Sequence, residues 1–157
     1  MRKAARQRDA AWALSVFRHA PFATLSLVRP DGSPYGVPVS IVVGDDTTLY
    51  FHCADEGEKI DCIAAQPLVS VSAVSRCTPC YEEEKHNFTM HYCSAIATGR
   101  ATVVQSPAEK TEALRLLCER FLPHHMHRFD EAVARSLDRT TIIRIDLTEP
   151  PVGKCKE

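Results

Sequence analysis

The sequence predicts an α+β fold that is mainly β: a closed or partly closed antiparallel barrel of six strands with peripheral helices. Three observations support this prediction. Six apolar segments of strand length are bounded by turn residues, helical patterns lie between some of them, and neither a linker nor a repeat interrupts the 157 residues. A composition of 45% hydrophobic and 25% charged residues is typical of a globular protein. We therefore expect a single domain over residues 1–157.

The first third of the chain predicts a helix and an antiparallel meander. Apolar residues at helical spacing favour a helix over residues 4–17, which Pro21 would end. The next three segments are predicted strands, because strong turn sequences such as Pro-Asp-Gly-Ser separate them. They cover residues 22–29, 35–43 and 48–53.

The rest of the chain continues to mix helices and strands. The capping box Ser-Pro-Ala-Glu at residues 106–109 starts a helix that runs to Phe121. Gly99, inside the long fifth strand, indicates a bulge or a close approach of another backbone. Polar residues and two breaking signals predict a loop over residues 76–89. The other predicted elements are helices over residues 55–65 and 129–137 and strands over residues 68–75, 90–104 and 140–147.

Charge and cysteine content limit the partners and the compartment. A formal net charge of -1 without a long basic run provides no cationic face for nucleic acid. No window reaches the roughly 18 apolar residues of a membrane span, and the basic start lacks a signal-peptide pattern. Seven cysteines, an odd number that lies mostly inside apolar segments, indicate free buried thiols. We expect a cytoplasmic protein with no nucleic-acid or membrane partner.

Residues 50–59 predict a strand that turns directly into a helix. The start of a helix presents free amide groups to an anion. His52, Gly57 and Lys59 would add a donor, close backbone access and a positive charge to such a site. The acids between residues 55 and 58, however, suit the first turn of any helix. The local chemistry leaves both interpretations open.

Pro38 interrupts a segment that otherwise has the pattern of a central strand. Proline has no amide hydrogen for the ladder, so we expect it at a sheet edge or a bulge. Backbone groups beside it are then free for another partner. Solvent is one such partner, and a flat heteroaromatic ring with alternating donors and acceptors is another.

Three motifs carry a family resemblance: FATLSLVRPDGSPYGVPVSIVV, then LYFHCADEGEKIDCI, then YCSAIATGRATVV followed by the capped helix SPAEKTEALRLL. In this order they resemble the flavin-binding split-barrel superfamily. More narrowly, the chain is similar over residues 10–147 to the 5-nitroimidazole-resistance (Nim) family of pyridoxamine-phosphate-oxidase-like proteins. The resemblance implies a six-stranded split β-barrel that binds FMN, with FAD as the alternative, at a homodimer interface.

The resemblance also implies the residues of a flavin site. A five-residue strand segment would run beside the isoalloxazine through its backbone, His52 and Cys53 would reach the phosphate and ribityl chain, and Lys59 would bind the phosphate. Ser94 would face the flavin. The full implied set is Val37, Pro38, Val39, Ser40, Ile41, His52, Cys53, Lys59 and Ser94.

The implied function is that of an FMN-dependent oxidoreductase. A nicotinamide or another donor would reduce the flavin, which would then reduce a small aromatic or nitro compound. The resemblance assigns no catalytic residue, and His52 is the one candidate for proton transfer. A flavin carrier or sensor without turnover is the alternative from another functional class.

Two departures from the family pattern bear on these expectations. Glu58 stands where the vitamin oxidases have a basic residue before the phosphate lysine, which predicts weaker phosphate binding or a larger share for His52 and the helix amides. The C-terminal sequence TEPPVGKCKE lacks the arginine and histidine cluster that holds pyridoxal phosphate in those oxidases. Oxidation of pyridoxamine phosphate is therefore not expected.

A cysteine-rich segment lies within the predicted loop and the strand after it. Cys77 and Cys80, with His86, His91 and Cys93 downstream, are candidates for a metal site or a redox pair. The spacing of the second half matches no common zinc motif, so a plain loop is the favoured interpretation.

A second cluster lies between the predicted helices after residue 121. His124, His125 and His127 are candidates for metal or haem, which some split-barrel relatives bind, against the favoured alternative of a solvated loop. The arginines of this region, expected on the surface or in the dimer contact, are Arg115, Arg120 and Arg128.

Overall fold

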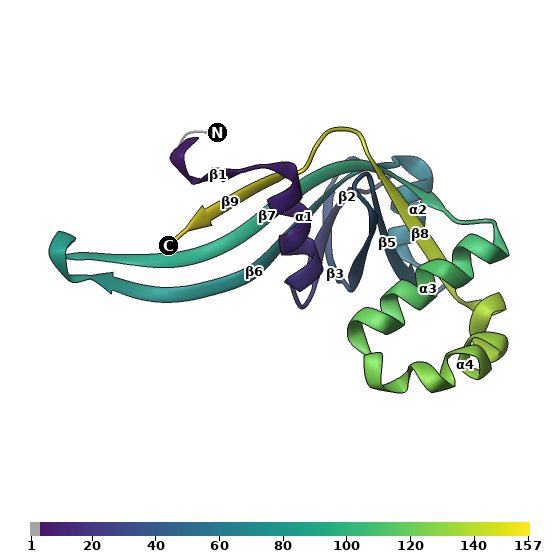
Figure 1. The fold of residues 1–157 in the computed structure, drawn as a ribbon. Coiled ribbons are helices and arrows are strands. Elements are labelled where there is room, and N and C mark those ends of the chain that lie inside the picture. The colour runs from purple at the N-terminus through teal and green to yellow at the C-terminus, as the bar shows by residue number, and fades with distance from the viewer. Residues whose placement is uncertain (1–3) are drawn as a thin grey trace.

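The computed structural model describes residues 4–157 and places them in one antiparallel sheet of nine strands, curled into an open barrel with helices outside it (Figure 1). The first three residues of the predicted domain lie outside the described part. The predicted fold class is confirmed. The strands are β1 (Gln7–Arg8), β2 (Ala23–Val28), β3 (Pro34–Val39), β4 (Ile41–Asp45), β5 (Thr48–Cys53), β6 (Leu68–Glu82), β7 (Asn87–Val103), β8 (Thr141–Leu147) and β9 (Val152–Lys156).

The helices lie between these strands. They are α1 (Ala10–His19), α2 (Glu58–Ala65), α3 (Pro107–Phe121) and α4 (Phe129–Ser136), with 3-10 turns η1 (Ala4–Arg6), η2 (Glu83–Lys85), η3 (Pro123–Arg128) and η4 (Leu137–Arg139). None of the helices within residues 4–157 is long and apolar enough to cross a membrane.

The barrel is split between β3 and β4. The strand order is β3-β2-β6-β7-β8-β5-β4, so these two consecutive strands form the opposite ends of the sheet. The predicted single strand over residues 35–43 therefore divides at Ser40: Val39 pairs with Ala23 in β2, whereas Ile41 pairs with Phe51 in β5. Pro38 lies on an edge strand, as its missing amide hydrogen requires.

One apolar core fills the barrel. Burial alternates along β2 and the first half of β6, because successive side chains of a strand point to opposite faces. Leu25 of β2, Val71 of β6 and Phe51 of β5 are fully buried in this core. Phe17 of α1 belongs to the same core. A second cluster of buried residues attaches α3 to the outside of the sheet.

The N-terminal helix is shorter than predicted. Asp9 accepts a hydrogen bond from the amide of Trp12 at 2.9 Å and caps α1, so the helix begins at Ala10 rather than at residue 4. Before the cap, the chain pairs in β1 with β9. The helix ends at His19, just before Pro21, as expected.

The prediction of a loop over residues 76–89 is wrong, because most of these residues belong to strands. β6 and β7 continue through it as a two-stranded arm, which Figure 1 shows reaching far beyond the barrel. The turn occupies only η2 and His86, which adopts a positive φ of 47°. Aromatic and β-branched residues favour strands, and the Tyr81 and Phe88 rings meet across the arm with centroids 4.8 Å apart. The charged residues that suggested a loop belong to the tip.

The C-terminal segment forms a strand that was not predicted. β9 pairs with β7 on one side and with β1 on the other. Gly153 permits this position, because a Cβ there would lie 2.4 Å from the Trp12 ring. The turn sequence around Pro150 gives no sign of a strand after it, and β9 is explained by its pairing with β7 and β1 and its packing against α1.

Two local predictions are confirmed. Ser106 caps α3 by accepting a hydrogen bond from the Glu109 amide at 3.4 Å, with Pro107 at the first helical position. Gly99 marks a close approach of another strand, since a Cβ there would lie 2.7 Å from the carbonyl oxygen of Asp146.

Candidate functional site

The junction between β5 and α2 contains most of the residues predicted for a phosphate. His52 is exposed and Cys53 is half-buried at the end of β5, where they pair with Ile142 and Thr141 of β8. The chain then leaves the sheet and enters α2 at Glu58, three residues later than the predicted start. His52 and Cys53 therefore lie at the end of a strand, as predicted.

Gly57 sets the start of α2. Its φ of 124° is a conformation that side chains disfavour, which prevents the helix from beginning earlier. A Cβ added at Gly57 would meet no atom within 4 Å, so the space beside this backbone is open. The first amides of α2 have no acceptor within the helix. A small anion can therefore approach the backbone here.

Lys59 brings a positive charge to the same junction. It is half-buried at the second position of α2. Burial raises the pKa of the Cys53 thiol, and the charge of Lys59 opposes that rise. The Lys59 side chain thus starts from the first turn of α2, next to the end of β5.

Arg29 is a site residue that the sequence did not predict. It lies just after β2, and its Nε donates to Glu58 Oε1 while its Nη1 donates to the Pro34 carbonyl at 2.7 Å. The hydrogen bond with Glu58 is the main reason that the pKa of Arg29 is raised. The carboxylate expected to repel a phosphate is thus paired with a cation. Its partner lies 29 positions away, so no local pattern could reveal it.

The strand segment predicted to run beside the flavin has two faces. Val37 and Val39 point toward the core, whereas Pro38 and Ser40 are exposed. Ile41 is fully buried, and its carbonyl accepts a hydrogen bond from Arg120. The edge of β3 is thus open to a partner, while the carbonyl of Ile41 is already occupied.

Ser94 lies apart from these residues. It pairs with Val74 in β6 and with Lys154 in β9. Two strands, β2 and β6, separate β7 from β3. The three strand-to-strand spacings from β3 to β7, about 4.8 Å each, amount to about 14 Å. Within one chain Arg29 links Glu58 of α2 to Pro34 at the start of β3, whereas Ser94 lies on a strand apart from both.

A family model described as pyridoxamine 5'-phosphate oxidase matches residues 8–152, nearly the whole chain. The chain belongs to this family. No curated protein matches the chain. The match covers every strand from β2 to β8 and all predicted flavin-site residues.

Solved structures with the same fold have low sequence identity to this family member. A proposed 5-nitroimidazole antibiotic resistance protein from Bacteroides thetaiotaomicron has a TM-score of 0.77 at 19% identity, covering 94% of this chain and 84% of that one. A flavocytochrome from Azotobacter vinelandii has a TM-score of 0.84 at 18% identity, covering 100% and 72%. An FAD- and haem-binding protein from Mycobacterium smegmatis has a TM-score of 0.80 at 22% identity, covering 97% and 74%. At these identities the likeness shows the fold.

In the present chain, the cysteine-rich segment lies on the arm formed by β6 and β7. Cys77 and Cys80 belong to one strand, where residues three apart point to opposite faces and lie about 10 Å apart. They cannot form a disulfide in this conformation. Among residues 4–157, no three His, Cys, Asp or Glu side chains converge closely enough to hold a metal ion.

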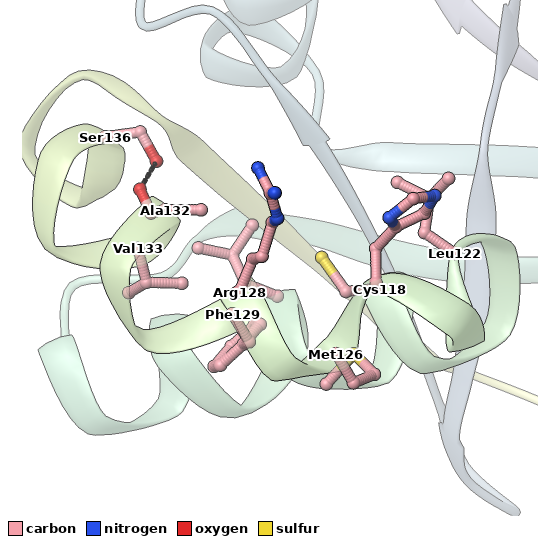
Figure 2. A pocket seen from close by; sticks show the side chains of 10 residues that line it. Cys118, Leu122, Met126, Arg128, Phe129, Ala132, Val133 and Ser136 are labelled. Carbon is pink, nitrogen blue, oxygen red and sulfur yellow. Dashed lines mark hydrogen bonds between the residues drawn. The ribbon is translucent and has the colours of Figure 1, made fainter.

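A cavity of about 190 Å³ lies in the helical layer of the present chain, between α3, η3 and α4. Figure 2 shows Cys118 and Arg128 beside it, with apolar side chains forming most of the wall. Of the predicted histidine cluster, His125 lines the cavity and is exposed. The cavity is smaller than the roughly 300–1,000 Å³ of pockets for drug-sized ligands.

Proposed function

We propose that this protein is a homodimeric flavoprotein that binds FMN and uses it to reduce small aromatic or nitro compounds. The observation that carries the proposal is the junction of β5 and α2, where the backbone at Gly57 is open and the first turn of α2, without a side-chain cap, contains Lys59. Membership of the pyridoxamine 5'-phosphate oxidase family supports a phosphate-bearing cofactor at this place. Relatives described as FAD-binding support a flavin in general.

The residues present suit a flavin phosphate. A phosphate is favoured at the positive end of a helix and gains charge-assisted hydrogen bonds from lysine and arginine. Lys59 provides one such donor. Arg29 becomes a second if a phosphate competes with Glu58 for its guanidinium. His52, exposed at the end of β5, would bind beside them.

Two copies of the chain would complete the site. Two strands separate Ser94 from the β3 edge within one chain, so a partner copy is the natural source of a second wall for the flavin ring. The outer face of the sheet also carries exposed apolar residues that suit a contact with another copy. These are Val28, Leu68, Val74 and Ile96.

Bound flavin would supply the electron transfer, and the chain would bind it, orient it and exclude water from it. Pro38 and its neighbours on β3 would hold the ring through their backbone. His52 is the candidate for moving a proton, because it is exposed beside the phosphate end of the site. A carrier or sensor would use the same contacts without turnover.

The phosphate assignment is tested by comparing FMN with riboflavin. We expect Lys59→Ala to weaken FMN binding by roughly ten- to a hundredfold, because a charge-assisted hydrogen bond contributes about 1.5–3 kcal/mol. Riboflavin has no phosphate, so its affinity should not change. Quenching of flavin fluorescence on titration with the protein measures both constants.

Lys85→Ala is the matched control. Lys85 lies at the tip of the arm with a 70% exposed side chain, and its loss should affect neither ligand. An equal loss of FMN and riboflavin affinity in Lys59→Ala would place the phosphate elsewhere.

The enzymatic proposal has a separate test. Protein reconstituted with FMN should lose its absorbance at about 450 nm on addition of NADH or NADPH and regain it on addition of a nitroimidazole. Reduced flavin that is reoxidised at the same rate with and without the nitro compound would favour the carrier or sensor.

A further inference from the structure

Three residues form one row across β6, β7 and β9. Arg76 lies directly opposite Cys93, and Cys93 lies directly opposite Cys155. Directly opposite residues of antiparallel strands share one face of the sheet. The two sulfurs are 3.0 Å apart, closer than two sulfur atoms in ordinary van der Waals contact.

A small movement of the two sulfurs toward each other would allow a disulfide bond. A disulfide requires a sulfur separation of about 2.05 Å and Cβ atoms about 3.5–4.5 Å apart. Cys93 and Cys155 need to close by about 1 Å, a shift that adjacent strands can accommodate. The pair is thus placed for a disulfide, whereas Cys77 and Cys80 on the arm are not.

The two thiols differ in access. Cys155 is 4% exposed, whereas Cys93 is half-buried. Burial and the hydrogen bond with Cys93 raise the pKa of Cys155 to about 11. Arg76 lies opposite Cys93 and donates a hydrogen bond to Glu157 at 3.1 Å. The Cys93 sulfur, followed by Glu157, raises the pKa of the guanidinium. A cation beside an accessible cysteine is a recurrent feature of cysteines that react with oxidants.

We propose that Cys93 and Cys155 form a reversible oxidation site, where hydrogen peroxide joins the two sulfurs into a disulfide. The Cys93 thiolate attacks a peroxide oxygen, the O–O bond breaks, and the released hydroxide takes a proton to become water. Cys93 is then a sulfenic acid. The Cys155 sulfur attacks the Cys93 sulfur, the S–O bond breaks, and hydroxide leaves with the Cys155 proton as a second water. Two thiols and one peroxide thus give one disulfide and two waters.

The disulfide fixes the C-terminal strand to the longest strand of the sheet. β9 also supports the N-terminal segment, through its pairing with β1 and through Trp12 above Gly153. The bond joins residues 62 positions apart and so restricts the unfolded chain strongly. Oxidation stabilises this end of the molecule and does not depend on whether flavin binds.

Peroxide treatment followed by mass spectrometry tests the proposal. The folded protein is exposed to a few equivalents of hydrogen peroxide, free thiols are alkylated, and the digest is searched for a peptide pair that joins Cys93 and Cys155. We expect this pair with a mass loss of two hydrogens, reversed by dithiothreitol. The thermal midpoint should rise by about 5–10 °C on oxidation and return on reduction. Alkylation of both residues to the same extent before and after peroxide would overturn the proposal.

Two variants separate the steps. In Cys155→Ser, Cys93 should accumulate as a sulfenic acid that dimedone traps, and no shift of the thermal midpoint should follow. In Cys118→Ser, which removes a half-buried cysteine of α3, the disulfide should form at the wild-type rate. If dimedone labels Cys77 rather than Cys93, the oxidised residue has been assigned wrongly.

Substitutions that remove or keep the positive charge at position 76 test the role of Arg76 in oxidation of Cys93. Arg76→Ala should slow formation of the disulfide several-fold, and Arg76→Lys should restore most of the rate, because only the charge beside Cys93 is needed. Equal rates of disulfide formation in the two variants would show that the positive charge of Arg76 does not assist the reaction of Cys93.

Discussion

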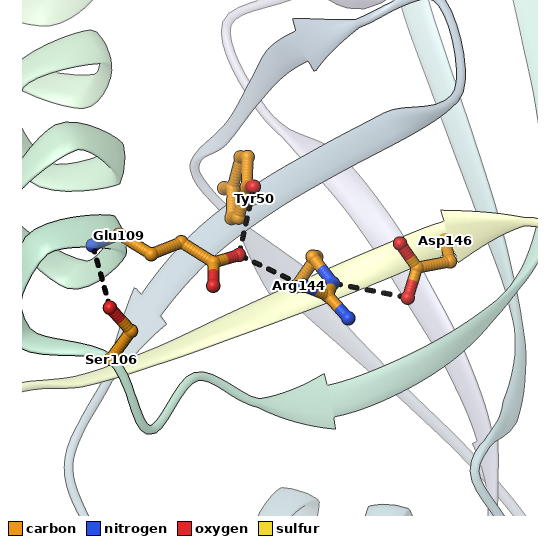
Figure 3. A network of polar contacts seen from close by, with 5 residues as sticks. All are labelled: Tyr50, Ser106, Glu109, Arg144 and Asp146. Carbon is orange, nitrogen blue, oxygen red and sulfur yellow. Dashed lines mark hydrogen bonds and ion pairs between the residues drawn. The ribbon is translucent and has the colours of Figure 1, made fainter.

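At the scale of single residues, one carboxylate joins a helix to two strands. Glu109 of α3 accepts hydrogen bonds at 3.1 Å from both the Tyr50 hydroxyl and Arg144, and Arg144 also donates to Asp146 (Figure 3). Burial, followed by the hydrogen bond to Glu109, raises the pKa of Tyr50 to about 12. The capping box predicted where α3 begins, but not that its glutamate would bind two strands.

We expect Tyr50→Phe to lower the free energy of unfolding by about 1–2 kcal/mol, because it removes a hydrogen bond to a charged acceptor and keeps the ring. Urea denaturation at neutral pH measures the change. Tyr35→Phe is the control, since the contact of Tyr35 with Arg29 is made by the ring, which phenylalanine keeps.

The same variant carries a pH signature. The folded state holds the Tyr50 proton up to a pKa of about 12, against an ordinary value of 10.0. This contribution to stability is complete below pH 10 and is lost as the pH rises from 10 towards 12. The difference in stability between wild type and Tyr50→Phe should therefore shrink over that range. A difference that stays constant from pH 9 to 12 would contradict the role given to this hydroxyl.

At the scale of elements, the close approach of β7 to β8 depends on one glycine. A Cβ at position 99 would lie 2.5 Å from Ile145 Cγ2 and 2.7 Å from the Asp146 carbonyl oxygen. We expect Gly99→Ala to destabilise the fold by about 1–3 kcal/mol, because the backbone must move. Gly36→Ala is the matched control in an edge strand, where the nearest atom would be 3.8 Å away. Thermal unfolding of both variants decides whether the close packing matters.

Arg120 attaches α3 to two other elements. The sequence predicted a surface or dimer-contact residue without a specific role. The structure instead shows its guanidinium donating to the Ile41 carbonyl and, at 2.6 Å, to the Ala20 carbonyl. Burial lowers the pKa of Arg120, so the two carbonyls offset the cost of enclosing the charge.

Arg120→Ala should therefore cost about 2–3 kcal/mol, because it leaves two carbonyls without this donor. Arg135→Ala, which breaks an exposed pair with Glu131, should cost less than about 0.5 kcal/mol. Equal losses in guanidinium denaturation would mean that the two carbonyls find other donors.

At the scale of the whole molecule, the proposed flavin site and the proposed dimer depend on each other. The outer face of the sheet exposes 48% of Val74 and 56% of Ile96, on neighbouring strands. Exposed apolar side chains on adjacent strands form a surface suited to another protein. The same face carries Ser94, the predicted flavin contact that one chain leaves apart from the others.

We expect light scattering after gel filtration to give twice the chain mass of 17.5 kDa. Ile96→Asp should shift the protein to the monomer and reduce FMN binding in parallel, because a charge opposes burial of this face. Leu122→Asp, an equally exposed leucine of the helical layer (55%), should change neither property. A monomer that binds FMN with full affinity would contradict the two-copy site.

The sequence by itself determined the elements whose causes are local. Alternating apolar residues predicted most of the strands, the capping box predicted where α3 begins, and Pro38 predicted a sheet edge. These signals depend on the period of each element or on the chemistry of one residue, so neighbouring residues suffice to read them. The motif order was also sufficient to indicate the family.

Only the tertiary structure decided which distant residues meet. In the structure Arg29 pairs with Glu58, Cys93 lies against Cys155, and Ser94 lies apart from the β3 edge. The structure also turned an expected loop into an arm and the C-terminal segment into a strand. Each of these outcomes depends on strand order and register, which bring together residues that are far apart in the chain, and no local pattern encodes that choice.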